Sequence, residues 1–311
     1  MAQPTHPVLR QTIKQRGKNS MAAFLFFAVV LIWGTTWYAI HMQVAVTDAN
    51  TAIFWRFLVA SALLAAWLKL SGKWKAVPRQ DIPLLALLGA TMFSCNYMFM
   101  YRAEQSISSG TVSVVFSLAV IFNMLNQWLF FRIRPALHGV VGGVLAVAGV
   151  ALMMGVTGAS LTEIDGIALA LGGTACFSIG NMISRHLLLK GLDLPTVVCR
   201  GMMWGCGFTG AWLLLTGHGL AGAWQLGWVA SLLYLAVPGS IIGFVAYLRL
   251  VHVIGADRAA YTTILSPVVA LVISSIAENS VWSASMGAGI ALVLVGNLVS
   301  FFPWHKLKAR A

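Results

Sequence analysis

The sequence predicts an all-α membrane protein with ten transmembrane helices in two inverted five-helix repeats. Composition is the first observation: 59% of the 311 residues are hydrophobic and only 9% are charged, whereas a soluble domain is about one quarter charged. The second observation is a series of apolar runs of roughly 20 residues, the length at which a helix crosses a bilayer. The third is a fixed-offset similarity between the two halves of the chain.

Ten apolar runs are long enough to cross a bilayer, and the segments between them are short. The runs are continuously apolar and lack the two-residue alternation of a membrane β-barrel. We therefore expect one helical bundle without a soluble domain, with a first repeat at residues 21–158 and a second at 165–303. The predicted spans are 22–42, 50–69, 82–101, 109–131, 137–157, 166–188, 194–215, 226–248, 259–277 and 283–303.

Lysine and arginine predict the orientation of the chain. The net charge is +12, but the basic residues form short clusters between apolar runs, which disfavours nucleic-acid binding. With the N-terminus inside, the inner segments hold seventeen of the twenty basic residues, and the outer segments hold only Arg102. Cytoplasmic segments of membrane proteins are rich in Lys and Arg. We therefore expect a multi-pass protein of a bacterial-type inner membrane, with cytoplasmic basic termini at 1–20 and 304–311.

The two halves of the chain match at a nearly constant offset. Arg56 falls on Arg200 at an offset of 144 residues, and Gly142 falls on Gly289 at an offset of 147. Each half holds five predicted spans, and an odd number means that the second half enters the membrane from the opposite side. Inverted repeats recur in secondary transporters, where the substrate site lies near the midplane between the repeats.

Several segments together resemble the EamA type of the drug/metabolite transporter superfamily. They are "WGTTWYAI" in the first span, "FWRFLVAS" in the second, "GADRAAYTTILSPVVALVISSIAE" through the ninth, and the glycine-rich "GVVGGVLAVAGVALMM" and "GAGIALVLVGNLVS" in the fifth and tenth. The resemblance covers nearly the whole chain. It implies a ten-helix carrier of small metabolites, commonly amino acids, drugs or purines. It also implies a cavity between helices 1–4 and 6–9, with helices 5 and 10 at the periphery.

The first half departs from the family pattern in its fourth span. Phe131 stands where the ninth span has Glu278, and Val120 stands where the ninth span has Pro267. The first half thus lacks the acid that usually closes that helix in the family. This departure speaks against a coupling mechanism that needs a carboxylate in both halves.

Two arginines lie within predicted spans. An arginine can reach the interface by extending its long side chain, whereas one at the bilayer centre normally faces a cavity or a partner. Arg56 and Arg200 are therefore either structural or part of a substrate path that attracts an anion. Because a guanidinium suits a carboxylate, the second alternative predicts substrates that carry a carboxylate or a similar anionic group.

Other polar and aromatic side chains within the spans are candidates for lining the cavity. Asn123 and Gln127 are four residues apart and share one helix face. An unpaired amide is costly in hydrocarbon, so these amides either bond between helices or line the cavity. The same alternatives apply to Asn96 and Asn181. The remaining cavity candidates are Tyr261 and, on one face of the first span, Trp33, Thr36 and Trp37.

Candidates for coupling or gating lie at span ends and at prolines. His41 ends the first span; we expect a simple hydrogen bond there, and proton coupling is the alternative because histidine titrates near neutral pH. Glu104 and Glu278 lie near outer span ends, where we expect solvated carboxylates, with outer-gate acids as the alternative. Pro238 and Pro267 break helical hydrogen bonds, which either makes a static kink or frees carbonyls to line the path.

The sequence as a whole predicts a secondary transporter that exports small metabolites such as amino acids by alternating access. It shows no Walker-type glycine-rich loop, no metal-ligand spacing and no nucleophile with a base, so we expect neither a cofactor, a metal nor an enzyme activity. A facilitator and a drug efflux protein are alternatives, and a membrane sensor or enzyme without transport is a remote one. We expect a monomer whose partners are the lipid bilayer and a small solute.

Overall fold

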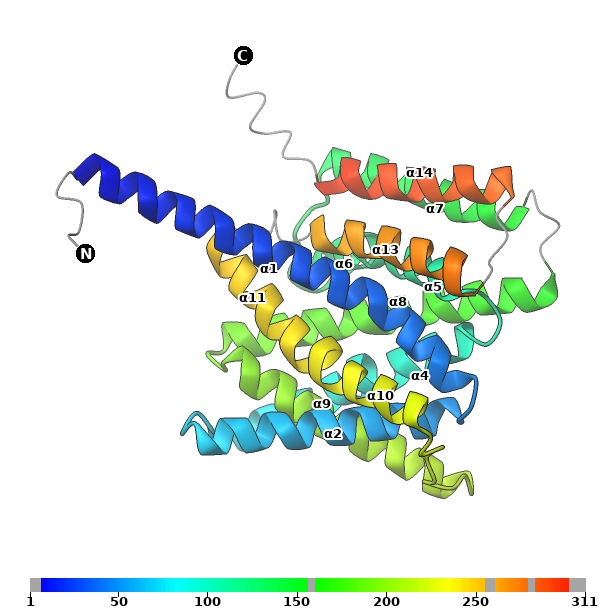
Figure 1. The fold of residues 1–311 in the computed structure, drawn as a ribbon, viewed down its shortest axis with the longest axis horizontal. Coiled ribbons are helices and arrows are strands. Elements are labelled where there is room, and N and C mark those ends of the chain that lie inside the picture. Colours follow the sequence, from blue (N-terminus) through cyan, green and yellow to red (C-terminus); the bar gives the residue numbers. More distant parts are fainter. Residues whose placement is uncertain (1–6, 156–159, 255–260, 279–282, 302–311) are drawn as a thin grey trace, which may run out of the picture.

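The computed structural model describes residues 7–155, 160–254, 261–278 and 283–301, and these residues form helices and turns without a strand. The helix axes are roughly aligned, and the helices form one bundle (Figure 1). In the first half they are α1 (Pro7–Val44), α2 (Ala49–Leu70), a 3-10 turn (Arg79–Asp81), α3 (Ile82–Ala90), a π-helix (Thr91–Cys95), α4 (Asn96–Ala103), α5 (Ser109–Phe116), α6 (Ala119–Phe131) and α7 (Leu137–Gly155).

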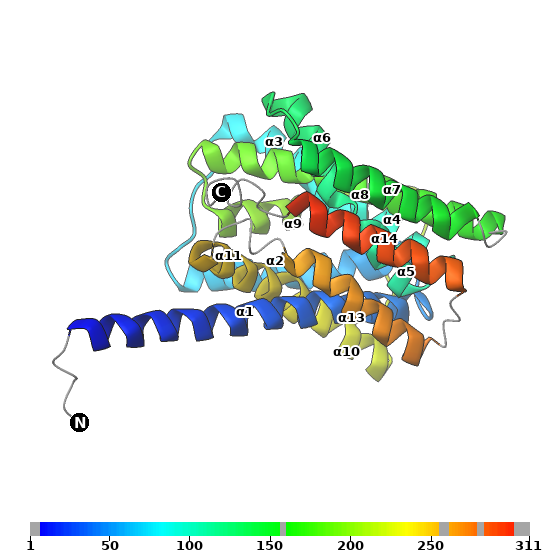
Figure 2. The ribbon, with the colours of Figure 1, turned by 90° about the horizontal axis from the view of Figure 1, so that it is seen from above.

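The second half continues with a similar series of helices. They are α8 (Leu161–Leu189), α9 (Leu194–Leu215), α10 (Leu226–Tyr234), a second π-helix (Leu235–Ile242), α11 (Gly243–Ile254), α13 (Tyr261–Ala277) and α14 (Ala284–Phe301). In its described residues every predicted span is helical, apart from a turn at residues 117–118 and residue 283. α1 begins well before the first predicted span and extends beyond the other helices (Figure 2).

Within the described residues, six helical stretches are long and apolar enough to cross a membrane: Ser20–Val44, Ala49–Leu70, Arg79–Ala103, Ser109–Phe131, Leu161–Leu189 and Leu226–Tyr247. Leu137–Met153, Thr262–Ala277 and Ala284–Ser300 are shorter apolar helices. A helical bundle satisfies every backbone hydrogen bond within its own segments, as the bilayer interior requires. The described chain is therefore a helical membrane protein.

Side-chain caps fix where several helices begin. Asp48 accepts hydrogen bonds from the backbone N–H groups of Asn50 and Thr51, at 3.0 and 3.1 Å, at the start of α2. Ser160 and Glu163 form a reciprocal capping box at the start of α8. Such caps satisfy N–H groups that have no partner within the helix. They fix the first residues of α2 and α8.

Both halves interrupt their third helix with a π-helix. The first lies at Thr91–Cys95 and the second at Leu235–Ile242, and moving the first by 147 residues places it at 238–242, inside the second. Pro238 has no N–H to donate, and the Ser240 hydroxyl donates to the Leu235 carbonyl at 2.8 Å. A π-turn widens the helix and is frequent at functional sites. The two breaks re-aim the side chains that follow them.

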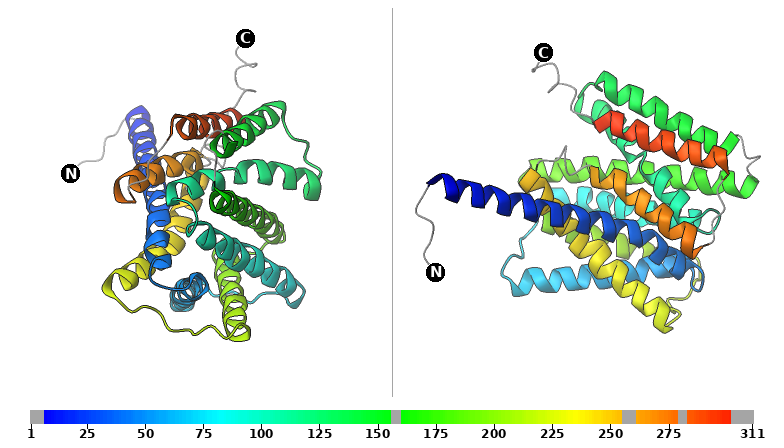
Figure 3. Two further views of the ribbon diagram at one scale, coloured as in Figure 1. Left: turned by 90° about the vertical axis from the view of Figure 1, so that its right-hand side faces the viewer. Right: turned by 45° about the horizontal axis from the view of Figure 1, so that its top comes forward.

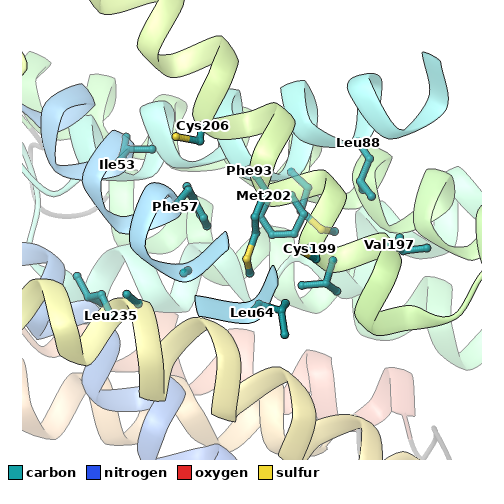
Figure 4. Packing of buried hydrophobic residues seen from close by; sticks show 14 of the residues in the cluster. Ile53, Phe57, Leu64, Leu88, Phe93, Val197, Cys199, Met202, Cys206 and Leu235 are labelled. Atoms are coloured by element: carbon teal, nitrogen blue, oxygen red, sulfur yellow. The ribbon is translucent and has the colours of Figure 1, made fainter. Parts of the chain in front are cut away.

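Within the described residues, buried apolar side chains form two clusters. The larger one joins α2, α3, the first π-helix and α9 around Phe57, Phe93 and Met202 (Figure 4). The second joins α5, α7, α8 and α14 around Val115. Trp37 of α1 packs against both clusters. It therefore lies where the two parts of the core meet.

α7 and α14 pack on each other through glycines at one edge of the bundle (Figure 3). A Cβ added to Gly142 would lie 2.2 Å from the Gly296 carbonyl oxygen, and one added to Gly149 would lie 2.6 Å from that of Gly289. Because the pairs run in opposite sequence order, the two helices are antiparallel. Their backbones touch so closely that only glycine fits at these positions.

Candidate functional site

Arg56 lies at the centre of a buried polar group, the Arg56 cluster, which also contains Gln43, Tyr97, Tyr101 and Ser240. The side chain of Arg56 is 3% exposed. Its Nε donates to the Ser240 hydroxyl at 3.2 Å, its Nη1 to Tyr101 Oη at 3.3 Å and its Nη2 to Tyr97 Oη at 3.5 Å. Tyr101 in turn donates to Gln43 Oε1 at 3.2 Å. The cluster joins α1, α2, α4 and the second π-helix.

The Arg56 charge has neutral partners. Its guanidinium carbon lies 4.7 Å from the centre of the Tyr97 ring and 5.6 Å from that of Phe57. In the described part of the chain no carboxylate lies within ion-pair distance of it. The guanidinium has five N–H donors and the protein engages three. A buried arginine without a counterion is costly, so this site suits an incoming anion.

The first-span candidates lie beside this cluster. Trp37 meets Phe116 at a ring separation of 5.3 Å, and Phe116 meets Phe177 at 4.8 Å. These rings come from α1, α5 and α8 and form an aromatic wall between the two halves. Thr36 is buried, with its hydroxyl bonded to the Trp33 carbonyl at 2.7 Å. The Thr36 hydroxyl is thus satisfied within its own helix. Contact of Trp37 or Thr36 with substrate stays a prediction.

Trp33 and its neighbours pack on other helices. The Trp33 ring lies 5.1 Å from that of Tyr247 and 5.7 Å from that of Phe244, both on α11. Gly34 faces α13, where an added Cβ would lie 2.6 Å from Val269 Cβ. Trp33 is thus a helix contact in this conformation.

The amides of α6 bond to α8. Asn181 Nδ2 donates to Asn123 Oδ1 at 3.2 Å, and Arg185 Nη1 donates to Gln127 Oε1 at 3.0 Å. A third pair joins Asn126 to the hydroxyl of Ser178 at 2.8 Å. Of the two alternatives for these amides, hydrogen bonding between helices is the one seen. All but Ser178 are partly exposed.

Asn96 is more deeply buried. It follows the first π-helix, and its Nδ2 donates to the Met92 carbonyl at 3.2 Å. Its Oδ1 is buried and has no partner. The amide nitrogen of Asn96 is therefore paired within its own helix, and the amide oxygen is left without a hydrogen-bond donor.

Arg200, the sequence counterpart of Arg56, has a different environment. Its guanidinium carbon lies 4.1 Å from the centre of the Trp74 ring, in the segment between α2 and α3. The same end carries the ion pairs Lys75–Asp193 at 3.0 Å and Lys190–Asp81 at 2.7 Å. Burial opposes ionisation of Asp193, but hydrogen bonds from Thr196 and Lys75 outweigh it and lower its pKa. Arg200 therefore belongs to a polar helix end, and Arg56 to the interior.

The two glutamates differ from expectation. Glu278 is half-buried at the end of α13 and accepts hydrogen bonds from the Ser109 backbone N–H, at 3.1 Å, and from the Ser109 hydroxyl. Glu104 is 4% exposed, and neither of its carboxylate oxygens has a partner. The expectation of a solvated carboxylate is wrong for Glu104, because the ends of α4 and α5 are packed against the bundle. A buried acid could not be read from its place at a span end.

The remaining gating candidates have these positions. His41 stacks on Tyr38 at 6.2 Å, and its buried Nδ1 has no partner, so the expected simple hydrogen bond is not present at that atom. Pro238 lies in the second π-helix and Pro267 within α13. Tyr261 begins α13, but its side chain lies outside the described part.

A pocket of about 380 Å³ lies at the end of the bundle that carries the α1–α2 turn. It is lined by Val46, Thr47, Asp48, Thr51, His218, Gly219, Ala221, Gly222 and Ala223. None of its lining residues belongs to the Arg56 cluster, although the backbone N–H groups of Val46 and Thr47 donate to the carbonyl of Gln43, a member of that cluster. The pocket is a surface hollow and not the predicted central cavity.

Sequence reasoning missed four members of the Arg56 cluster. Gln43, Tyr97, Tyr101 and Ser240 are polar groups within or beside apolar spans, which was the available signal. Tyr97 and Tyr101 are also four residues apart and so share a face of α4. Their convergence on Arg56 depends on three other helices, and no sequence spacing encodes that.

An apolar helical bundle with a buried polar cluster indicates an integral multi-pass membrane protein, and the family comparison shows that its class is the transporters. The EamA-like transporter family model matches this chain twice, at residues 20–155 and 164–302. The chain belongs to the EamA-like transporter family, as the resemblance implied.

Several known proteins are similar over most of their length. An uncharacterized transporter of Archaeoglobus fulgidus is 29% identical, covering 86% of this chain and 94% of the relative. A probable terminal-alkyne amino-acid exporter of Streptantibioticus cattleyicolor is 26% identical, covering 89% and 90%. The inner membrane transporter YedA of Escherichia coli is 28% identical, covering 80% of each chain. A solved crystal structure matches the fold with a TM-score of 0.64 at 16% identity, covering 90% of this chain and 97% of that one.

Proposed function

We propose that this chain is a secondary transporter that exports small amphipathic metabolites, such as amino acids, by alternating access. The observation that carries the proposal is Arg56, a buried cation with spare donors whose hydrogen-bond partners are all neutral groups. A substrate carboxylate would supply the missing counterion, and the Trp37–Phe116–Phe177 wall would receive its apolar part. The relative described as a probable amino-acid exporter supports this substrate class.

Alternating access in this proposal comes from ten spans in two inverted halves, at 21–158 and 165–303. The two matches of one family model fall within a few residues of these bounds. At an offset of 147 residues, Gly142 corresponds to Gly289 and Gly296 corresponds to Gly149. The Gly142–Gly296 contact therefore has a counterpart in the Gly149–Gly289 contact, which is also observed. The paired π-helices follow the same offset. Such reciprocal contacts support a pseudo-twofold relation between the halves.

Contacts between the halves support a conformation that is closed at one end. α5 of the first half meets α13 of the second through Ser109 and Glu278. A Cβ on Gly110 would lie 3.0 Å from Ser274 Cβ, so the helices touch there. By the charge distribution this end faces outward, with both termini in the cytoplasm. The proposed outward release requires α5 and α13 to separate.

Uptake into proteoliposomes tests the proposed function. The purified chain is reconstituted and presented with a panel of radiolabelled amino acids and amphipathic drugs, with and without a pH gradient. We expect at least one carboxylate-bearing solute to accumulate above the level of protein-free liposomes. Absence of movement for every solute under every gradient, with folded protein, would contradict the proposal.

A further inference from the structure

Glu104 is a buried acid that the proposed function does not yet use. It follows α4 directly, just beyond the apolar stretch Arg79–Ala103. It is 4% exposed, and both carboxylate oxygens lack a hydrogen-bond partner. An ionised carboxylate in such a place is costly, and a buried group of this kind becomes neutral instead.

Charged side chains from two other helices act on Glu104 electrostatically. They are Glu278, directly after α13, and Arg56 on α2. Burial and then Glu278 raise the pKa of Glu104 well above its usual range, and Arg56 opposes this rise. The neutral form is therefore favoured while the site stays buried.

The other helices near Glu104, α1 and α8, carry few charged groups at this end of the bundle. α1 contributes His41 and the fully buried Gln43, whose Nε2 has no partner. α8 brings Gly166 against Ser106, and its nearby acids are exposed.

Glu278 links this acid to the contact between the halves. Its carboxylate holds the start of α5 through the Ser109 N–H and hydroxyl. Ionised Glu104 would place a second negative charge beside Glu278 in a desolvated region. Like charges that share a site repel strongly there, and separating α5 from α13 would relieve the repulsion by letting water reach both carboxylates.

We propose that Glu104 is a proton-binding site whose protonation holds the outer end closed. A proton from the outer solution binds a carboxylate oxygen, and the neutral acid can then be buried beside Glu278. Loss of that proton restores the carboxylate and favours opening between α5 and α13. The closed form is thus favoured at low outer pH, and it loses this stabilisation as the pH rises through the raised pKa of Glu104. The inference rests on the proposed function, since it assigns the proton to the gate of that transporter.

Accessibility of a buried cysteine tests the gate without needing a substrate. Ser113 is fully buried one turn along α5 from Gly110. Ser113→Cys is made with Cys95 and Cys176 replaced by Ala, and an impermeant maleimide is added from outside at several pH values. The labelling rate is divided by that of Gln105→Cys, an exposed residue of the same end, because thiol reactivity itself rises with pH.

We expect this labelling ratio to rise from low to high pH. The rise should be about tenfold for each unit by which the pKa of Glu104 in the closed form exceeds its pKa in the open form. Glu104→Gln, which mimics the neutral acid, should keep the ratio low at every pH, and Glu104→Asp should restore the response. Asp165→Asn, an exposed acid of the same end, should behave as wild type.

A pH-independent ratio in the wild type, or an unchanged pH response in Glu104→Gln, would overturn the inference. The uptake assay reports independently on transport, so a failed gate and a failed transporter can be told apart.

Discussion

Replacing Arg56 by glutamine is the perturbation that probes substrate recognition most sharply. The variant keeps a polar side chain near Ser240 but removes the charge and the two donors that the protein leaves unused. A hydrogen bond to a charged group contributes about 1.5–3 kcal/mol, and 1.4 kcal/mol is a tenfold change in affinity. Loss of one such bond predicts binding weaker by about 10- to 150-fold, and loss of a bidentate pair predicts more.

The assay is equilibrium binding of an identified substrate to purified protein, compared with its carboxamide analogue. Arg56→Gln should weaken binding of the carboxylate and leave the amide nearly unchanged, because the amide cannot form the charge-assisted pair. Arg200→Gln is the matched control: it removes an arginine that stacks on Trp74 at the helix end, and should change affinity by less than about threefold. Equal losses for carboxylate and amide, or no loss in Arg56→Gln, would refute the reasoning.

Three further outcomes are expected. Trp37→Ala should change the order of preference among solutes in competition uptake, while the melting temperature of the protein stays within a few degrees. An unchanged order would show that Trp37 does not contact the substrate. Gly296→Ala should lower stability by about 1–3 kcal/mol by overpacking against α7, whereas Gly287→Ala on the same helix, which meets no atom within 4 Å, should be neutral in thermal unfolding. Asp48→Cys and Lys73→Cys should label from opposite sides of the membrane; labelling from one side would contradict the topology.

The helices could be predicted from the sequence because each one is a continuous apolar run bounded by turn or capping residues. Asp48 and Ser160 cap helices close to where the runs begin. The first π-helix was not predicted, since Thr91–Cys95 carries no proline and no break in hydrophobicity, whereas Pro238 marked a break within the second. The turn at Ser117 and Leu118 was likewise hidden, because neither residue is a glycine or a proline and both lie inside one long predicted span.

The candidate site could be predicted only in part, for a physical reason. Arg56 was identifiable as a charge in a span, but its tyrosine partners depend on how α2 packs against α4. Arg56 and Arg200 looked equivalent, yet one lies among tyrosines and the other on Trp74. Burial of Glu104 likewise depends on the packing of α4 and α5, which a position along the chain does not reveal.

The central claim is that solute crosses by movement of one half against the other, and a reversible lock at the closed end tests it most directly. A Cβ on Gly110 would lie 3.0 Å from Ser274 Cβ, slightly closer than the about 3.5–4.5 Å of a disulfide, so Gly110→Cys with Ser274→Cys can be bridged after a small shift. The pair is made with Cys95 and Cys176 replaced by Ala. In proteoliposomes the account predicts that oxidation abolishes solute flux and that reduction restores it. Full flux while the disulfide is intact would contradict the account.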